Sequence, residues 1–542
     1  MKKICSFLHI QFICYSFIRW KNIYGYLLRW YTKYCSAFIY WFELFFLSIV
    51  YCVSLEMLMF ILSKFNWKMK FKLYYVLLSL CFFSCEKEVF DVIGSHDAAD
   101  YGFLPDASAK ENTFALQKAL DENKIVIVNT SGIYQIDSTI VLRSDNQLIF
   151  NEGTYVKKVG DKANNWGYVF VNKGALTKTY DENITIKGLK LIVNHQDGHG
   201  SNLIRGLNGH LSFFYIKNLI IEDFECLDLG TSLFAIHICT FSNIRLNNGH
   251  VEGDKDAIHL GRGKGFTVRN YIFNTFDDPV ALNGQDYDTS NPEVGWIEDG
   301  IVENCIDRSE NPNGYFCRIL AGGFVNWYAG MKLQKSDAVI HNGRMYRIIA
   351  EPDGKEYISQ TPPNHLVGFE QIDGINWLMM QEDITYTAGV RNVCFRDLLI
   401  DTKRLAVFSL HFDNDEWSRS YYPEAEIPVQ ENIRIENVTV KNAGTWRFIS
   451  CRTPVGSLYI KDSHLACYAI DFIDNSEIED FKHTDVTFDH CVFTGEGVLD
   501  LISNETANKT ITLKTFGSRI EAIDFQPQIK GPDIVIASDL FD

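Results

Sequence analysis

The feature that most constrains the fold is a short phrase of two β-strands that repeats along the chain. Each copy alternates apolar and polar side chains and has a polar or glycine bend in its middle. Copies that begin at residues 217, 242 and 264 are 25 and 22 residues apart. A repeat of this length without long amphipathic stretches predicts a solenoid whose coils each add one strand per face. The copies span residues 182–193, 217–228, 242–253, 264–275, 391–402, 431–442, 456–467 and 484–495.

We therefore expect an all-β chain folded as a right-handed parallel β-helix. The stretch before the first coils, residues 98–142, predicts a loop, a helix at roughly residues 111–122, and strands that "SGIY" interrupts. This stretch resembles the opening of pectate-lyase-superfamily proteins, in which a short helix caps the first coil. An exposed sheet end invites pairing with another chain, so an N-terminal capping helix has a physical purpose.

One segment breaks the repeat. Residues 324–388 lack the two-strand phrase, and "VIHNGRMYRII" predicts a β-hairpin that turns at Asn342 and Gly343. We interpret this segment as a small β-rich insert between the first part of the β-helix, residues 86–323, and the second part with a C-terminal cap, residues 389–542. The insert contains the aromatic residues Trp327, Tyr346 and Trp377. They form either a sugar-stacking platform or the core of the insert, and we favour the core.

The N-terminus differs from the rest of the chain. Residues 1–68 are crowded with apolar and aromatic side chains, and residues 41–63 are long enough to span a bilayer. Residues 69–85, "MKFKLYYVLLSLCFFSC", then have the basic start, apolar middle and small-residue end of a secretory signal. The ending resembles a bacterial lipoprotein signal with Cys85 as the lipidated residue, and "CEKE" resembles the surface-export tags of Bacteroides-type lipoproteins.

We interpret Met69 as the true translation start and residues 1–68 as upstream sequence that was wrongly included in the protein. The alternative is that residues 1–68 are a real, membrane-anchored extension. We expect an exported protein, either an outer-membrane or cell-surface lipoprotein or a periplasmic protein. Its contact with the membrane would then be the lipid anchor at Cys85.

The charge of the chain excludes some partners. Residues 1–85 hold 10 of the 51 Lys/Arg and 2 of the 68 Asp/Glu, so the net charge of −17 becomes −25 for the remainder. Such a surface repels nucleic acid and anionic membranes, and we expect no nucleic-acid partner. The eight cysteines after residue 85 form no CxxC pair, so we expect no zinc site, and no GxGxxG or P-loop motif indicates a nucleotide.

The register of successive coils brings three aspartates together. The stretches "FAIHI", "DAIHL" and "DPVAL" begin at residues 234, 256 and 278, so each lies 22 residues after the one before. Asp256 and Asp278 should therefore occupy the same position one coil apart, with about 4.8 Å between the strands. Asp277 should flank them at a bend or strand start. Clustered carboxyls raise one another's proton affinity, so that protonated and ionised forms coexist.

Such a trio fits glycoside hydrolysis, in which one carboxyl protonates the leaving oxygen while another activates water or attacks carbon. A separation of about 6.5–9.5 Å between the carboxyls would leave room for the water and imply inversion. The structural alternatives are a calcium site or a pair of Asp-headed turns. We favour catalysis by the trio, because the register of the coils makes the three side chains coincide.

The three aspartates resemble the catalytic pattern of the polygalacturonases, glycoside hydrolase family 28. "EGDKDAIHL" is similar to the first Asp motif of that family, and "FDDPVALNG" is similar to its Asp-Asp motif. The resemblance covers the coils, at roughly residues 95–320 and 390–510. It implies that Asp277 is the general acid and that Asp256 and Asp278 position and activate water.

Two other motifs of that family are incomplete or missing. Its Gly-His-Gly motif should follow the Asp pair by some twenty residues, where this chain has "GWIEDGIVENC". Its Arg-Ile-Lys motif appears only as Arg318-Ile319-Leu320, without the Lys that would hold a uronate carboxylate. With the negative net charge, this departure favours a neutral or differently decorated glycan over polygalacturonate. Other inverting β-helix hydrolases with a similar trio, such as bacterial α-galactosidases, remain alternatives.

Further candidates surround the trio. His237 and His259 share a register and are either stacked sugar donors or satisfied core histidines. Arg262, Asn283 and Asp286 follow the acidic strands, where loops commonly carry binding groups. "LHFDNDEWSRSYY" interrupts a later coil and either overhangs the cleft or forms an ordinary surface loop. The predicted substrate-binding residues are His237, His259, Arg262, Asn283, Arg318, Asp413 and Trp417.

The expected function is therefore a glycoside hydrolase, with a poly- or oligosaccharide as its partner and no cofactor or metal. One alternative is a polysaccharide lyase on the same fold, in which the aspartates would hold Ca²⁺ and a base would come from Arg262, Lys264 or Arg318. The other alternative is a non-catalytic surface protein that binds glycans, because a fold alone does not decide function.

Overall fold

The structure of the protein is a computed structural model. It describes residues 94–160, 167–194, 204–310, 312–349, 355–412, 420–445, 447–467, 470–472, 484–494, 498–504, 510–521, 526–531 and 534–537. The proposed signal with Cys85, and the binding candidates Asp413 and Trp417, lie outside the described residues and stay predictions. The described part of the chain contains no helix that is both long and apolar enough to cross a membrane.

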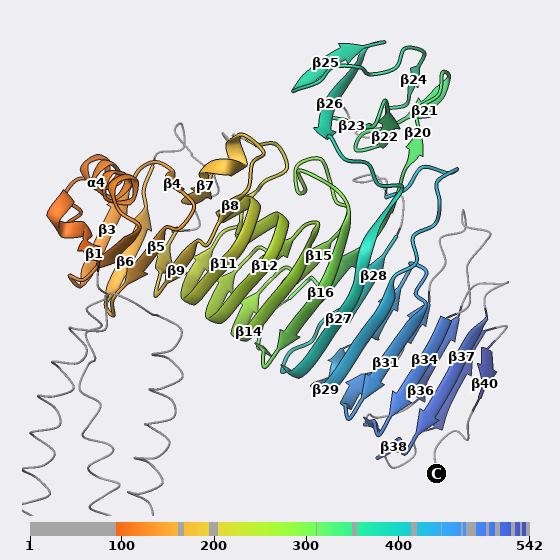
Figure 1. Ribbon diagram of the computed structural model, residues 1–542. Helices are drawn as coiled ribbons and strands as arrows, with labels where there is room; N and C mark the ends of the chain where they lie inside the picture. Colours follow the sequence, from red (N-terminus) through yellow and green to blue (C-terminus); the bar gives the residue numbers. More distant parts are fainter. Residues whose placement is uncertain are drawn as a thin grey trace, which may run out of the picture. The chain divides into compact units, whose positions relative to one another are not determined.

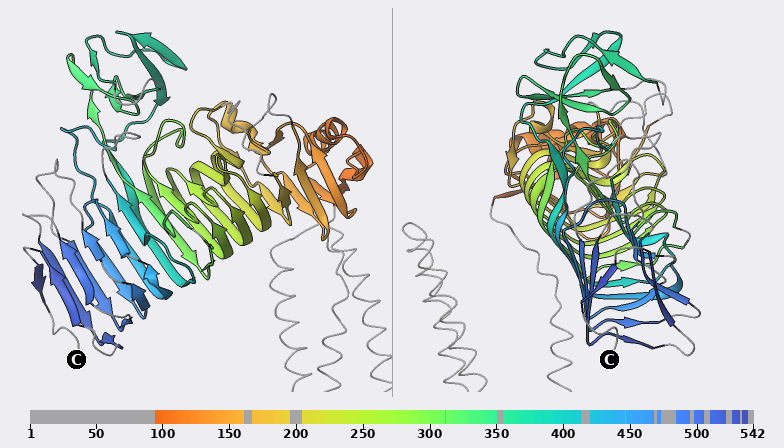
Figure 2. Two further views of the ribbon diagram at one scale, coloured as in Figure 1. Left: turned by 180° about the vertical axis from the view of Figure 1, so that it is seen from behind. Right: turned by 90° about the vertical axis from the view of Figure 1, so that its right-hand side faces the viewer.

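Strands of successive coils pair in parallel and build a long β-helix (Figures 1 and 2). In the middle of the stack, Leu219 pairs with Ile244, and Ile244 pairs with Phe266. These pairs keep the 25- and 22-residue spacings of the sequence repeat. The prediction of an all-β, right-handed parallel β-helix is therefore confirmed.

The strands of the coils fall into three runs along the chain. The first run is β1 (Ser95–Asp97), β2 (Ile125–Val128), β3 (Gly132–Ile136), β4 (Ile140–Leu142), β5 (Gln147–Phe150), β6 (Thr154–Lys158), β7 (Phe170–Asn172), β8 (Asp181–Glu182), β9 (Thr185–Lys187) and β10 (Lys190–Ile192). The middle run is β11 (Gly209–Leu229), β12 (Phe234–Gly253), β13 (Ile258–Leu260), β14 (Gly263–Thr275), β15 (Val280–Asn283), β16 (Trp296–Glu303), β17 (Ile306–Asp307), β18 (Cys317–Leu320) and β19 (Gly322–Gly323). The last run is β27 (Thr387–Ile400), β28 (Ala406–His411), β29 (Glu431–Thr445), β30 (Arg447–Cys451), β31 (Ser457–Lys461), β32 (His464–Cys467), β33 (Ile470–Phe472), β34 (Thr484–Asp489), β35 (Val492–Phe493), β36 (Val498–Asn504), β37 (Ile511–Phe516), β38 (Arg519–Ile520), β39 (Gln526–Lys530) and β40 (Ile534–Ile536).

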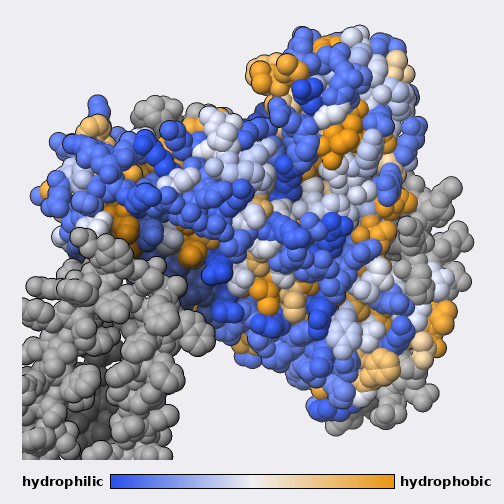
Figure 3. All heavy atoms as spheres, in the orientation of Figure 1, coloured by the Kyte–Doolittle hydropathy of each residue, from blue (hydrophilic) through white to orange (hydrophobic). Residues whose placement is uncertain are grey.

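The core lies inside the coils and consists of stacked aliphatic and aromatic side chains. Alternate residues of each strand point inward, so that Leu219, Ile244 and Phe266 are all buried in one continuous cluster. Burial of each such side chain stabilises the fold by about 1.5–3 kcal/mol before the loss of chain entropy is counted. Outward residues are polar over most of the face seen in Figure 3.

Asparagines at the bends between strands stack into a ladder. The amide of Asn218 donates to Oδ1 of Asn183 at 2.9 Å, and the amide of Asn243 donates to Oδ1 of Asn218 at 2.8 Å. Later coils continue with Asn392 and Asn432, whose amides are 3.1 Å apart. All five residues have φ between 51° and 60°. Asn tolerates this left-handed region better than most residues, so the bends favour Asn and each amide ties one coil to the next.

Helix α4 (Ala109–Glu122) lies between the short 3-10 helix η1 (Ala98–Tyr101) and strand β2, and a second 3-10 helix, η2 (Lys173–Leu176), lies between β7 and β8. Ser108 and Glu111 form a capping box at the start of α4, in which each side chain accepts the backbone N–H of the other residue. Leu116 and Leu120 are buried on the face that contacts β2, β3 and β4. The predicted helix is therefore present, but its role as a cap stays a prediction.

The segment without the repeat forms sheets of its own. Tyr346 and Trp377 are fully buried in its core, and Trp327 packs against them, which supports a module core over a sugar platform. The predicted hairpin is present, with Asn342 and Gly343 at φ of 49° and 73° in the two-residue turn. The strands are β20 (Val325–Asn326), β21 (Met331–Leu333), β22 (Ala338–His341), β23 (Arg344–Ile348), β24 (Tyr357–Ser359), β25 (Phe369–Ile372) and β26 (Ile375–Gln381).

Asn392 tests the contribution of the ladder. Asn392→Ala removes an amide that is bonded to Asp299 and Asn432, and it leaves alanine at a φ of 57°. We expect the free energy of unfolding, measured by urea titration, to fall by about 1–2 kcal/mol. Asn392→Gly, the control, tolerates this φ and should lose less. Wild-type stability in Asn392→Ala would contradict the ladder's role.

Candidate active site

The backbone keeps the predicted register at the acidic coils. Ile258 pairs with Val280 one coil later, 22 residues along the chain. The N–H of Ala257 donates to the carbonyl oxygen of Asp278 at 3.1 Å, so the same register extends to the residues that precede the strands. Asp256 and Asp278 therefore lie at equivalent positions, two residues before strands β13 and β15 of adjacent coils.

The three predicted carboxyls meet in one cluster. Asp256, Asp277 and Asp278 each contribute an oxygen that lies within 4.8 Å of the others. Asp256 and Asp278 are only 4% and 2% exposed, whereas the side chain of Asp277 is 31% exposed. Solvent therefore reaches the cluster at Asp277, while the other two carboxyls are buried behind it.

Two later segments of the chain hold the Asp pair in place. The N–H of Tyr315 donates to Oδ1 of Asp278 at 2.7 Å, and a Cβ on Gly314 would lie 2.5 Å from that oxygen. Arg404, which is buried, donates to the carbonyl oxygen of Asp277 at 3.1 Å. No motif marks these contacts, because 37 and 127 residues separate the hydrogen-bonded partners.

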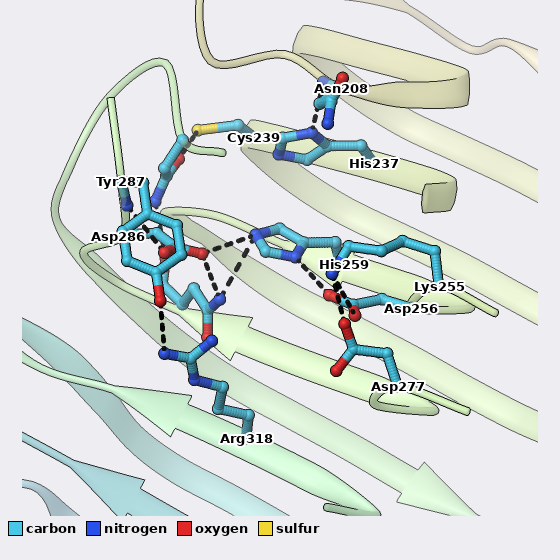
Figure 4. A network of polar contacts seen from close by, with 12 residues as sticks. Asn208, His237, Cys239, Lys255, Asp256, His259, Asp277, Asp286, Tyr287 and Arg318 are labelled. Atoms are coloured by element: carbon cyan, nitrogen blue, oxygen red, sulfur yellow. Dashed lines mark hydrogen bonds and ion pairs between the residues drawn. The ribbon is translucent and has the colours of Figure 1, made fainter. Parts of the chain in front are cut away.

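A lysine lies inside the acidic cluster. The ammonium of Lys255 forms an ion pair with Oδ2 of Asp277 and lies 3.8 Å from Oδ1 of Asp256 (Figure 4). It also lies 5.6 Å from the ring centre of Phe234, close enough for a cation–π contact. Lys255 was not among the predicted site residues, and its neighbour Asp256 in "GDKDA" was the one clue to its location.

The three carboxyls have unequal proton affinities. Burial raises the pKa of Asp256, but the charge of Lys255 and the hydrogen bond with His259 outweigh it, and the pKa falls to about 2. Burial and the charge of Asp256 raise the pKa of Asp277, against the opposing effect of Lys255. Burial and the charges of Asp277 and Asp256 hold the pKa of Asp278 well above its usual range. Asp256 is thus ionised at neutral pH, and Asp278 is the carboxyl most strongly driven to keep a proton.

His259 and Asn283 lie beside the trio in a buried polar network. Nδ1 of His259 lies 3.0 Å from Oδ2 of Asp256, and its Nε2 lies 3.4 Å from Oδ2 of Asp286 (Figure 4). The amide of Asn283 donates to the same oxygen of Asp286 at 2.6 Å. His259 and Asn283 are each 1% exposed, so both serve internal contacts in this state of the site.

The structure places His237 and Arg262 in internal contacts. His237 is fully buried, and its Nδ1 accepts the N–H of Asn208 at 2.9 Å, whereas its Nε2 has no hydrogen-bond partner among the described residues. Arg262 forms ion pairs with Glu293 at 2.9 Å and Asp383 at 2.7 Å. Neither side chain is presented to a sugar in this arrangement, so their predicted binding roles gain no support.

Arg318 lies on the strand after the acidic coils. It occupies the position that pairs with Ala281, and its guanidinium lies 5.9 Å from the ring centre of Tyr287 and donates to that hydroxyl at 3.5 Å. Burial lowers the pKa of Arg318, but the charges of Asp286, Tyr287 and Asp278 raise it well above its usual range. Its Nε is buried and has no hydrogen-bond partner among the described residues.

Comparisons with known proteins found solved structures of low sequence identity to this chain. No protein-family model and no curated protein matches the chain. A family 28 exopolygalacturonase of Yersinia enterocolitica is 11% identical over 82% of this chain and 78% of that chain, with a TM-score of 0.44. An α-1,3-glucanase of Streptomyces thermodiastaticus is 14% identical over 80% and 69%, with a TM-score of 0.41. A surface adhesin of Streptococcus pneumoniae is 12% identical over 79% and 91%, with a TM-score of 0.40.

These three structures differ in function, and their TM-scores lie below 0.5. They are an exopolygalacturonase, an α-1,3-glucanase and an adhesin, so the likeness does not decide between an enzyme and a binding protein. The function has to be argued from the chemistry of the carboxyl cluster.

Asp256 should contribute to stability in a defined pH window. Its pKa of about 2 in the folded protein lies below the ordinary value of 3.8, so folding stabilises its ionised form. This contribution is complete above about pH 4 and is lost as the pH falls towards 2. Above about pH 4 the wild type should therefore have a higher free energy of unfolding than Asp256→Asn. This difference should shrink as the pH falls towards 2.

Thermal or urea unfolding at stepped pH measures this difference. Asp254→Asn is the matched control, because Asp254 is exposed and lies two residues away. A difference between wild type and Asp256→Asn that does not change between pH 5 and pH 2 would contradict the charge assignment.

Proposed function

We propose that the protein is a glycoside hydrolase that acts on a poly- or oligosaccharide, with Asp277 as general acid and Asp256 as general base. The observation that carries the proposal is a cluster of three carboxyl oxygens within 4.8 Å of one another, in which Asp277 is open to solvent. The surroundings lower the pKa of Asp256 and raise the pKa values of Asp277 and Asp278. Glycoside hydrolysis needs one carboxyl in each protonation state beside the scissile bond.

Asp277 suits the role of the acid because it combines access with a raised pKa. A general acid must touch the leaving oxygen, and Asp277 is the carboxyl of the trio that is substantially exposed. When its proton moves to the glycosidic oxygen, Asp277 becomes a carboxylate. The ammonium of Lys255 lies against it and would stabilise the charge that appears at this step.

Asp256 suits the role of the base because its low pKa keeps it ionised. A single water can bridge two oxygens that are up to 4.8 Å apart, since each hydrogen bond spans about 2.8 Å. Asp278, which the family resemblance implies to be a second base, is instead driven towards its neutral form. In that form its hydroxyl can donate a hydrogen bond and help to hold the water that Asp256 deprotonates.

The residues fit a calcium-dependent lyase less well. The trio offers few oxygens compared with the six to eight that Ca²⁺ takes, and the ammonium of Lys255 already lies among them. Of the bases predicted for a lyase, Arg262 is paired with Glu293 and Lys264 with Asp299. The cluster therefore favours hydrolysis over elimination.

The cations near the trio favour a neutral or lightly decorated glycan. Lys255 is held by carboxylates, and Leu320 stands where the polygalacturonase resemblance expects a lysine. Arg318 is the other cation whose charge acts on the trio, and a single guanidinium suits a hydroxyl or a single acidic substituent.

Activity can be tested by incubating the full chain with a panel of plant, algal and host glycans. We expect release of reducing sugar without a gain in ultraviolet absorbance and without sensitivity to EDTA. Asp277→Asn should reduce turnover by about 10²–10⁴-fold at unchanged folding, because it removes the general acid. The exposed Asp254→Asn serves as the control. Undiminished turnover in Asp277→Asn would rule out the acid assignment, and an EDTA-sensitive gain in absorbance would indicate a lyase.

The stereochemistry of the product tests the role of Asp256. The closest oxygens of the trio are nearer than the separation of about 6.5–9.5 Å typical of inverting pairs. With one water bound by Asp256, we still expect inversion, which proton NMR of the first reducing ends would show as the anomer opposite to the cleaved bond. Retention would contradict this role and indicate a carboxylate nucleophile.

A further inference from the structure

His259 joins the trio to a fourth carboxyl. Its ring stacks on Phe234 at 4.1 Å between centroids with an interplanar angle of 12°, and it meets the ring of His237 edge-on at 4.7 Å. Nδ1 lies 3.0 Å from Oδ2 of Asp256, and Nε2 lies 3.4 Å from Oδ2 of Asp286 (Figure 4). The ring is therefore held by stacking on Phe234 and by the hydrogen bond between Nδ1 and Asp256, while Nε2 lies 3.4 Å from both the carboxylate of Asp286 and the amide nitrogen of Asn283.

Asp286 is itself held firmly in the loop between β15 and β16. Its oxygens accept the N–H of Tyr287 at 2.7 Å and the amide of Asn283 at 2.6 Å, and the residue is 2% exposed. Arg347 of the inserted module anchors the same loop, because it donates to the carbonyl oxygen of Asn291 at 2.9 Å. The fourth carboxyl therefore has a defined position from which it can restrain His259.

The contact with His259 determines which oxygen of Asp256 is available. Oδ2 of Asp256 faces His259, whereas Oδ1 lies 3.8 Å from the ammonium of Lys255, towards Asp277. A buried carboxylate is costly unless hydrogen bonds and opposite charges compensate it. His259 supplies such a bond on one side of Asp256 and leaves the other oxygen directed at the cluster.

We propose that His259 is a positioning residue for the proposed hydrolysis, one that holds Oδ2 of Asp256 so that Oδ1 faces the water site, while Asp286 keeps the imidazole in place. This inference rests on the proposed function, and it gives His259 a role other than sugar binding. If His259 had a purely structural role, its substitution would not change the pKa of Asp256.

The electrostatic surroundings support this role. Burial raises the pKa of Asp256, Lys255 opposes it most strongly, and the hydrogen bond and charge of His259 come next. Loss of His259 should therefore raise the pKa of Asp256. The titratable or charged groups that face His259 or Asp256 are His237 on β12, Lys255 before β13, Asp277 and Asp278 before β15, Asp286 after β15 and Arg318 on β18.

Two substitutions separate the two contacts of the ring. The amide nitrogen of Asn lies where Nδ1 of histidine lies, and that of Gln lies where Nε2 lies. His259→Asn therefore keeps a donor to Asp256 and loses the contact with Asp286, whereas His259→Gln does the reverse. The matched control is His210→Gln, because His210 is a fully buried histidine on β11 without a hydrogen-bond partner among the described residues.

We expect the acidic limb of the kcat/KM profile to move to higher pH by about one unit or more in His259→Gln. His259→Asn should move it less, and His210→Gln should leave it in place. KM should change little in both His259 variants, because the residue is buried and acts through Asp256. Identical limbs in the wild type and both variants would overturn the inference while leaving the hydrolase assignment intact.

Unfolding at stepped pH gives a second readout that needs no substrate. The depressed pKa of Asp256 stabilises the fold above about pH 4, and this contribution is lost as the pH falls towards 2. The loss of stability in His259→Gln relative to wild type should therefore shrink over that range, and that of His259→Asn should change less. A loss that is independent of pH in both variants would overturn the inference. The predicted pattern without hydrolysis of any glycan would support the coupling and overturn the proposed function instead.

Discussion

Backbone hydrogen bonds between adjacent coils are the interaction on which the rest of the structure depends. They fix each strand against the one 22 residues later around the site, and so decide which outward side chains become neighbours. A slip of one residue would turn every side chain of a strand to the other face. Asp256 and Asp278 are neighbours because this register holds at the bends where both are found.

The surroundings then shift the pKa values of neighbouring carboxyls in opposite directions. Asp256 has a cation on one side and an imidazole on the other, whereas at Asp278 burial and the charges of Asp277 and Asp256 outweigh Arg318 and a backbone N–H at 2.7 Å. The pKa is therefore lowered at Asp256 and raised at Asp278, one coil apart. Lys255 offsets part of the repulsion between the three carboxyls.

Local and periodic features could be predicted from sequence, and contacts between distant segments could not. The β-helix and the meeting of the three aspartates follow from strand alternation and a constant spacing. Arg404 holds the backbone at Asp277 from 127 residues away, which no repeat reveals. The expectation that Arg262 binds a sugar came from its place after a strand, but its partner Asp383 lies in the inserted module. Burial and pairing of this kind depend on the folded loops.

The proposed hydrolysis requires a sugar to bind with its glycosidic bond at the exposed edge of the carboxyl cluster. A crystal structure of Asp277→Asn with an oligosaccharide that the wild type cleaves would show this position. We expect the glycosidic oxygen within about 3 Å of the side chain at position 277, with a water at Asp256. A sugar bound elsewhere on the coils, or a glycosidic oxygen beside a different acid, would contradict it.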